Sequence, residues 1–193
     1  MHTATQKQAI IPNAILAMLI FVGTEVMFFA ALISAFLVIK AQIPFWPPPG
    51  EPRLPAVATA FNTGVLLASW VLLHLAGKSY AIQFQLAKTR RLMLIGIGLG
   101  AFFVLFQGYE WIQMISFGLT MVSSVYGGLF YFIIGTHALH VTAALSFLVY
   151  LWTRMGDPSG ERMDPSVLTA GRILWTFVVG IWPLLYALVY LDW

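Results

Sequence analysis

Apolar residues fill five long runs of this chain, and short polar or proline-rich stretches separate the runs. The runs cover residues 11–39, 56–77, 92–114, 125–152 and 173–191. A helix needs about 20 apolar residues to cross the hydrocarbon core of a bilayer. Each run therefore predicts one membrane-spanning helix, and the first and fourth runs are long enough to tilt or to extend beyond the lipid.

Prolines and glycines separate the runs where helices are expected to end. Six prolines lie between residues 44 and 55, so this stretch cannot be helical throughout. A second group marks the loop before the fifth run: Gly156, Pro158, Gly160 and Pro165. Pro183 lies inside the fifth run and is expected to kink that helix without ending it.

Composition places the whole chain in the membrane. Of its 193 residues, 60% are hydrophobic and 9% are charged, whereas a soluble domain has about 25% charged residues. No interval between runs reaches the roughly 50 residues of a separate domain, so residues 1–193 are predicted to form one integral membrane domain. The first run is too long for a signal peptide and lacks a small-residue cleavage site, so it is expected to be retained. The chain has no cysteine, which excludes disulfides and thiolate metal sites.

The basic residues predict how the chain is oriented. Lys40 and Arg53 fall on one side of the predicted membrane. The other side receives the remaining basic residues: Lys7, Lys78, Lys88, Arg90, Arg91, Arg154, Arg162 and Arg172. By the positive-inside rule the N-terminus is expected in the cytoplasm and the C-terminus outside. The net charge of +3 thus reflects topology and gives no reason to expect nucleic-acid binding.

Two further patterns suggest where the helices meet lipid and each other. Tryptophans near the run ends are expected to act as interfacial anchors: Trp46, Trp111, Trp152, Trp175 and Trp193. Small residues four apart predict close helix contacts. They occur at Gly96 and Gly100, at Ala30 and Ser34, at Ala31 and Ala35, and at Ala138, Thr142 and Ser146.

Glu25 is the polar residue that most needs a partner. It lies in the middle of the first run, and its helical neighbours Phe28, Phe29 and Leu32 offer no hydrogen bond. A carboxylate at bilayer depth costs about 3 kcal/mol. The group is therefore expected to be a protonated acid hydrogen-bonded between helices, or to hold a partner, a lipid headgroup or a proton.

Two histidines lie midway along the fourth run, and a second glutamate lies near the end of the third. His137 and His140 share one face of a helix, three residues apart. Three interpretations remain open: metal or haem ligands, which need a further ligand; a proton relay with Glu25 or Glu110; or neutral imidazoles that tie helices together. No nucleophile–base pair or phosphate-binding glycine loop is present, so no catalytic site is predicted. Metal ligation is not carried into the expected site, because His74 and the two glutamates are the only further ligands at depth.

Four sequence blocks resemble subunit III of the haem-copper terminal oxidases, in the family's order and spacing. The first is Gly23-Thr24-Glu25-Val26-Met27-Phe28-Phe29-Ala30, and the second is Trp46-Pro47-Pro48. The third is Gln107-Gly108-Tyr109-Glu110-Trp111. The fourth joins Tyr126-Gly127-Gly128-Leu129-Phe130-Tyr131 to Gly135-Thr136-His137-Ala138-Leu139-His140-Val141. Together the blocks span nearly the whole chain, which resembles the short, five-helix bacterial form.

The resemblance implies a non-catalytic subunit in a bacterial plasma membrane. It implies docking on a catalytic subunit I and a subunit II that carry the haem and copper, with a small subunit IV or a larger respiratory supercomplex as further partners. It also implies phospholipid binding, support of complex stability and of proton delivery, and no redox cofactor on this chain. The residues carried over as lipid or proton-linked polar contacts are Glu25, Tyr109, Glu110, His137 and His140.

The fifth run departs from the family pattern Trp-His-Phe-x-Asp-x-x-Trp. It reads Trp175-Thr176-Phe177-Val178-Val179-Gly180-Ile181-Trp182, so two polar groups are missing at Thr176 and Val179. This difference puts a polar network through the fifth helix in doubt. It leaves room for a divergent branch, such as an oxidase built into a larger supercomplex or an accessory subunit of a nitric oxide reductase. A quinol oxidase subunit III is a further alternative, because the electron-donor sites lie on other subunits. A stand-alone proton channel or transporter that uses Glu25, His137 and His140 is the third.

Overall fold

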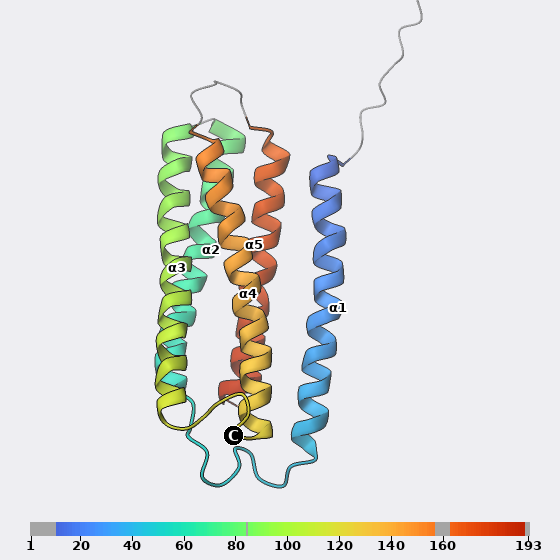
Figure 1. Ribbon diagram of the computed structural model, residues 1–193. Coiled ribbons are helices and arrows are strands. Elements are labelled where there is room, and N and C mark those ends of the chain that lie inside the picture. The colour runs from blue at the N-terminus through green and yellow to red at the C-terminus, as the bar shows by residue number, and fades with distance from the viewer. Residues whose placement is uncertain (1–10, 84, 157–162, 192–193) are drawn as a thin grey trace, which may run out of the picture.

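The chain folds into a bundle of five long helices (Figure 1). The computed structural model describes residues 11–83, 85–156 and 163–191. The helices are α1 (Asn13–Ala41), α2 (Ala56–Gln83), α3 (Leu86–Ser116), α4 (Val125–Arg154) and α5 (Pro165–Tyr186). Successive helices run antiparallel (Figure 1), and each is long and apolar enough to cross a membrane. The prediction of an all-α bundle with five apolar helices is confirmed.

Several helix ends lie beyond the apolar runs that predicted them. Helix α2 continues to Gln83 and α3 begins at Leu86, so Lys88, Arg90 and Arg91 are helical. Helix α5 begins at Pro165 instead of residue 173. Hydrophobicity marks where lipid surrounds a helix, whereas caps and breakers mark where the helix ends. As a consequence Trp175 lies well inside α5 and is fully buried, so its prediction as an interfacial anchor is wrong. Lys7, Arg162 and Trp193 lie outside the described residues.

The early start of α5 has a local cause. Pro165 takes the first helical position, where its missing N–H costs nothing. The side chain of Asp164 accepts a hydrogen bond of 2.8 Å from the backbone N–H of Ser166. This cap satisfies one of the donors that every helix start leaves without an intrahelical partner.

The Asp164 cap predicts a dependence of stability on pH. The hydrogen bonds from Ser166 hold the pKa of the Asp164 carboxyl below its ordinary value of 3.8. Because the folded pKa is the lower one, the cap contributes fully above that ordinary value and is lost as the pH falls through the folded pKa. We expect Asp164→Ala to lower the melting temperature at neutral pH and to lessen its change on acidification. Asp164→Asn, which keeps the accepting oxygen, is the control, and equal melting curves for both variants would exclude the cap.

Helix α5 continues past Pro183, as predicted. Proline lacks the N–H that would bond the carbonyl four residues earlier, and its ring crowds that carbonyl. The helix nevertheless extends to Tyr186 and then widens into a π-helical turn, Ala187–Leu191. Polar groups near this end reach other helices, since the Tyr186 hydroxyl donates to the Ala56 carbonyl over 2.9 Å.

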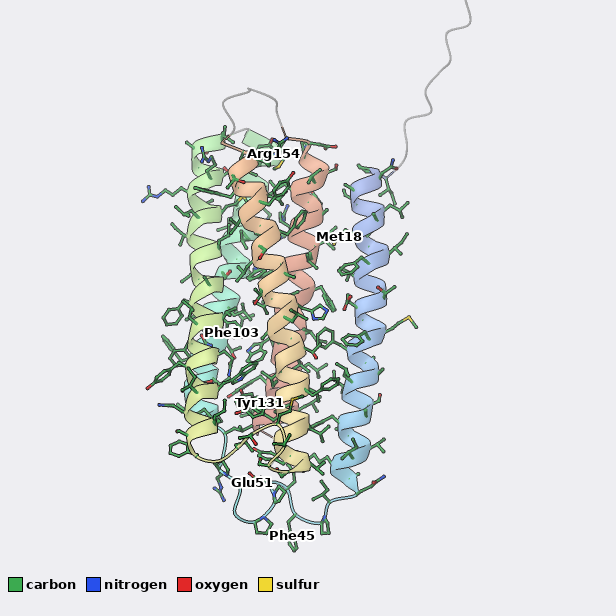
Figure 2. All side chains as sticks on the ribbon, viewed as in Figure 1. Met18, Phe45, Glu51, Phe103, Tyr131 and Arg154 are labelled. Carbon is green, nitrogen blue, oxygen red and sulfur yellow. The ribbon has the colours of Figure 1, made fainter. Side chains whose placement is uncertain are left out.

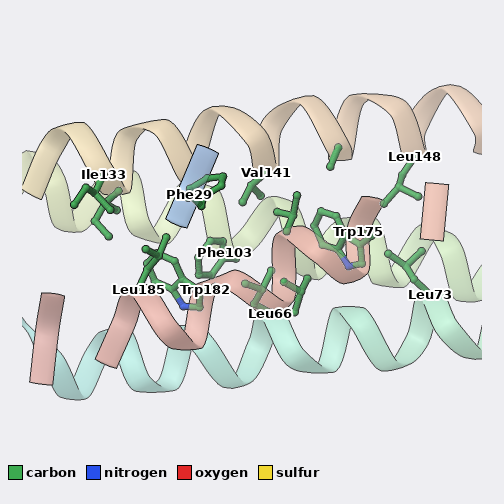
Figure 3. Close-up of a cluster of buried hydrophobic side chains, with 14 of the residues drawn as sticks. Phe29, Leu66, Leu73, Phe103, Ile133, Val141, Leu148, Trp175, Trp182 and Leu185 are labelled. Atoms are coloured by element: carbon green, nitrogen blue, oxygen red, sulfur yellow. The ribbon is translucent and has the colours of Figure 1, made fainter. Parts of the chain in front are cut away.

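The core of the bundle surrounds α5, which packs on α1, α2 and α4. Trp175 and Trp182 are fully buried, and the ring of Trp182 meets that of Phe103 edge-on at 5.0 Å. Figure 3 shows Trp182 between Phe103 and Leu185 in this core. Helix α1 buries only Phe29 and Phe36 among its described residues, and it packs mainly on α5.

Of the small-residue patterns, only the glycines on α3 make close contacts. A Cβ added at Gly96 would come within 2.9 Å of Leu73, and one at Gly100 within 2.8 Å of Leu145 and Trp175. The other pairs are largely exposed: Ala30, Ala31, Ser34, Ala35, Thr142 and Ser146. The hydroxyls of Thr142 and Ser146 bond carbonyls of their own helix. The prediction of contacts within this chain is therefore wrong for these six residues, whereas Ala138, the first residue of the predicted stripe on α4, is half-buried.

The two ends of the bundle differ in charge. Figure 2 shows Arg154 at one end and Glu51, with Phe45, in the loop at the other. The helix order places Lys78, Lys88, Arg90 and Arg91 at the Arg154 end and Lys40 and Arg53 at the Glu51 end. The uneven distribution of basic residues that the sequence indicates is therefore present in the fold.

Candidate functional site

Glu25 of α1 meets His140 of α4 across the gap between these helices. Their Oε2 and Nε2 atoms lie 2.9 Å apart, and the two side chains are 16% and 19% exposed. The rings of Phe28 and Phe29 lie 6.1 and 5.1 Å from the imidazole. The pair is thus a polar bridge in an apolar setting, and it joins the helix with the fewest buried residues to the rest of the bundle.

The hydrogen bonds of His140 determine how the bridge holds a proton. Its Nδ1 lies 2.8 Å from the Thr136 carbonyl oxygen, which can only accept, so Nδ1 carries a hydrogen. The contact between Nε2 and Glu25 then contains one further proton, either on the carboxyl or on the imidazole. In both states the pair is neutral overall, which is the inexpensive condition for ionisable groups inside a membrane.

His137 points to a different part of the bundle. It is 1% exposed and stacks on Trp182 with ring centroids 5.0 Å apart and planes 23° from parallel. Neither ring nitrogen has a hydrogen-bond partner in the described structure. Residues three apart on a helix lie about 60° apart around its axis, which lets His140 face α1 while His137 faces α5. The described residues contain no group of three or more His, Cys, Asp or Glu placed to hold a metal ion.

The different surroundings of the two histidines give opposite expectations for their replacement. His137→Phe should leave the melting temperature unchanged or raise it, because a phenyl ring keeps the stacking and buries no unpaired polar atom. His140→Phe should lower it by about 4–8 °C, because it leaves the Glu25 carboxyl without its partner, at a cost of about 2 kcal/mol. Thermal unfolding of the two purified variants measures this difference. A larger loss for His137→Phe than for His140→Phe would contradict it.

Glu110 lies in a second polar cluster, built from α2, α3 and the π-helical turn. It is 3% exposed, and its carboxyl accepts hydrogen bonds from Thr59 at 3.0 Å and Gln107 at 2.9 Å. The Gln107 amide also lies 2.9 Å from the hydroxyl of Tyr190. Sequence reasoning anticipated Glu110 as a polar contact but missed Thr59 and Tyr190, which carry no local signal. Gln107 did carry one, because it opens the third family-like block.

Tyr109, His74 and Trp46 lie apart from both clusters. Tyr109 is 57% exposed, and its hydroxyl accepts from Gln113 on its own helix. His74 lies nine residues before the end of α2 and meets Arg172 of α5, with 2.9 Å between Nδ1 and Nη2. Trp46 packs edge-on against Phe36 and Tyr126, at 5.7 and 5.0 Å. These contacts bring the loop of the second family-like block onto α1 and α4.

Helix α5 has polar contacts despite the departures at Thr176 and Val179. The hydroxyl of Thr176 accepts a hydrogen bond of 3.0 Å from the indole N–H of Trp70. The indole N–H of Trp182 donates over 2.8 Å to Thr63. Val179 is 2% exposed and belongs to the apolar core. The fifth helix therefore does make polar side-chain contacts with another helix, and α2 supplies both partners.

The fold and these contacts define a class, a polytopic bundle of apolar helices in which buried polar side chains connect one helix to the next. A family model described as "Cytochrome c oxidase subunit III" matches residues 2–193. The chain belongs to the cytochrome c oxidase subunit III family, and it is thus a subunit of the oxidase complex, with subunits I and II as its associates.

Individual relatives agree with the family match. The probable cytochrome c oxidase subunit 3 of Mycobacterium leprae is 33% identical over 184 residues, covering 93% of this chain and 88% of the relative. That of Nocardia farcinica is 34% identical over 185 residues, with the same coverage. The cytochrome c oxidase subunit 3 of Synechocystis is 29% identical over 173 residues and matches 72% of that protein. The resemblance seen in four sequence blocks therefore extends along nearly the whole chain.

Proposed function

We propose that this chain is the non-catalytic subunit III of a haem-copper terminal oxidase of the cytochrome c type, in aerobic electron transport. The observation that carries the proposal is the family match from residue 2 to residue 193. The convergence of Glu25 and His140, from the first and fourth family-like blocks, supports it. In this role the haem and copper belong to the partner subunits, and this chain docks on subunit I and stabilises the complex.

The two polar clusters support a role in holding helices together and in proton-linked contact. The Glu25–His140 bridge holds one exchangeable proton near the surface of the bundle, so we assign to it the contribution of this chain to proton delivery. The described hydrogen bonds of Glu110 run to Thr59 and Gln107, not to that bridge. This separation favours a docked subunit over a continuous proton path through the chain alone.

The uneven distribution of charge supports one orientation and location. The bundle end that carries Lys78, Lys88, Arg90, Arg91 and Arg154 is proposed to face the cytoplasm of a bacterium, with the chain in the plasma membrane as a single integral domain. The C-terminus then lies outside. Phospholipid between the helices, and a small subunit IV or a larger supercomplex beside them, complete the proposed surroundings.

Reconstitution of the purified chain separates this proposal from a stand-alone proton channel or transporter. In phospholipid vesicles with an imposed pH gradient, the chain alone should conduct no more protons than empty vesicles, and it should show no haem absorbance. Membranes from cells that lack the chain should still show the haem spectrum of the oxidase, but they should contain less of the fully assembled complex. Proton conduction by the chain that Glu25→Gln abolishes would overturn the proposal.

A further inference from the structure

Arg172 is a cation placed inside a membrane helix. It follows the first residue of α5 by seven positions, which is about 10 Å along the axis. Its Nη2 donates to Nδ1 of His74 over 2.9 Å. Because a guanidinium only donates, this nitrogen of His74 must be an acceptor and the imidazole is neutral. The histidine therefore positions the guanidinium without cancelling its charge.

The guanidinium of Arg172 is packed against the protein and incompletely satisfied. Its Nε is buried and has no hydrogen-bond partner in the described structure. The side chain lies over Gly77 of α2, where an added Cβ would collide with it. Lys78, the residue after Gly77, is exposed at the same end of the bundle. Positive charge is thus concentrated at one place where an anionic group would gain charge-assisted hydrogen bonds.

A mostly apolar groove passes Arg172 and runs between α1 and α5, with Thr169 and Thr176 of α5 in its lining. It has a volume of about 400 Å³, and Val22 of α1 and Ile173 and Phe177 of α5 line it beside His74 and Arg172. The rings of Phe29 and Phe177 meet at 6.0 Å, farther along both helices from Arg172. The groove therefore has a cationic end near the membrane surface and an apolar end toward the bilayer centre.

We propose that this groove binds one anionic phospholipid, with the phosphate on Arg172 and an acyl chain along Val22, Ile173 and Phe177. The shape and charge of the groove select this occupant over others. A zwitterionic lipid brings its own cation and gains less from Arg172 and Lys78. A soluble anion would leave the apolar length of the groove without a partner, and an acidic side chain of a protein would do the same.

The inference rests on the proposed membrane role of the chain and deepens its lipid-binding part by naming a site and a lipid class. Its own contribution is the assignment of Arg172 and His74, neither of which belongs to a family-like block. The lipid would also fill space beside α1, the helix with the fewest buried residues. It would therefore act together with the Glu25–His140 bridge in holding α1 to the bundle.

Retained lipid, counted by mass spectrometry, tests the site. The full chain is reconstituted in bilayers of equal parts phosphatidylglycerol and phosphatidylcholine, extracted in mild detergent and analysed without denaturation. The native chain should keep one phosphatidylglycerol and no phosphatidylcholine. Arg172→Gln should weaken retention about tenfold, the loss of about 1.4 kcal/mol, and Val22→Trp should do so by filling the groove. Arg172→Lys keeps the charge and should restore part of the retention.

Two matched variants control for charge and bulk. Arg91→Gln removes an exposed cation from the same end of the bundle, and Val26→Trp adds bulk to a position of α1 that is 51% exposed. Both should retain the lipid like the native chain. Equal retention by Arg172→Gln and the native chain would overturn the proposal, as would displacement of the lipid by inorganic phosphate.

Copurification with the partner subunits distinguishes failure of the lipid site from failure of the proposed function. Copurification of the native chain with a haem-bearing subunit tests the proposed function alone. If Arg172→Gln keeps its lipid but no longer copurifies with that subunit, Arg172 binds a carboxylate of the partner and the lipid site is wrong. If Arg172→Gln loses the lipid and the haem-bearing subunit is still recovered, both proposals stand.

Discussion

Gly100→Ala is expected to destabilise the bundle by about 2 kcal/mol, the cost of forcing one extra methyl into a packed core. The new Cβ would lie 2.8 Å from Leu145 and from Trp175. Trp175 is fully buried, so its ring cannot move without disturbing α4 and α5. Thermal unfolding in detergent should show a fall of about 4–8 °C, at about 2–4 °C per kcal/mol for a chain of this size. Gly100→Leu should prevent the native packing altogether.

Gly98→Ala is the matched control on the same helix. Nothing lies within 4 Å of a Cβ added at Gly98, and alanine favours a helix over glycine by about 1 kcal/mol. Its melting temperature should therefore equal or exceed that of the native chain. Equal melting temperatures for Gly98→Ala and Gly100→Ala would show that α3 does not approach α4 and α5 as closely as described.

Glu25→Leu is expected to weaken the attachment of α1 by about 2 kcal/mol, because it leaves Nε2 of His140 without a partner. Helix α1 has few other buried contacts, so its protease sensitivity should rise before that of the remaining bundle. Limited proteolysis of the intact complex measures this order. Retention of the haem-bearing subunit by the variant should fall in parallel.

Two companion variants distinguish a hydrogen bond from an ion pair at Glu25. Glu25→Gln should cost little, because the amide can still donate to Nε2 of His140. The double variant Glu25→Leu with His140→Leu should recover most of the loss, since it leaves no unpaired polar atom in the bilayer. A loss for Glu25→Gln as large as that for Glu25→Leu would show that the bridge needs the carboxyl, and with it the proton.

The helices could be predicted from the sequence because membrane spans and apolar runs have the same physical cause. Their ends could not, since residues such as Lys88 and Arg91 remain helical where no lipid requires it. Trp175 illustrates the consequence. Counted from a helix start at residue 173 it is an interfacial anchor, whereas counted from Pro165 it lies in the core. The cap at Asp164, and not hydrophobicity, decides between these positions.

The site residues could be named from the sequence, but their partners could not. Burial cost alone indicates that Glu25 needs a partner, yet His140 lies 115 residues away in the chain and only the fold brings it near. The spacing of His137 and His140 suggests a shared role, and both rings contact Phe29. A turn of about 60° nevertheless gives them different further partners, Trp182 for His137 and Glu25 for His140.

Small residues were poor guides for a related reason. Among the small residues that the spacing singled out, Gly96 and Gly100 are the ones at which another helix leaves no room for a Cβ. The spacing did not single out Gly77 and Gly171, where α5 and α4 respectively lie as close.

The measurement that tests the central claim most directly is a mild-detergent pull-down of the tagged chain, with a reduced-minus-oxidised spectrum and mass spectrometry of what copurifies. We expect haem bands together with a large catalytic subunit and a copper-binding subunit II, and no haem bands once this chain is separated from them. Recovery of a colourless chain without partners, from membranes that contain the oxidase, would contradict the assignment as its subunit III.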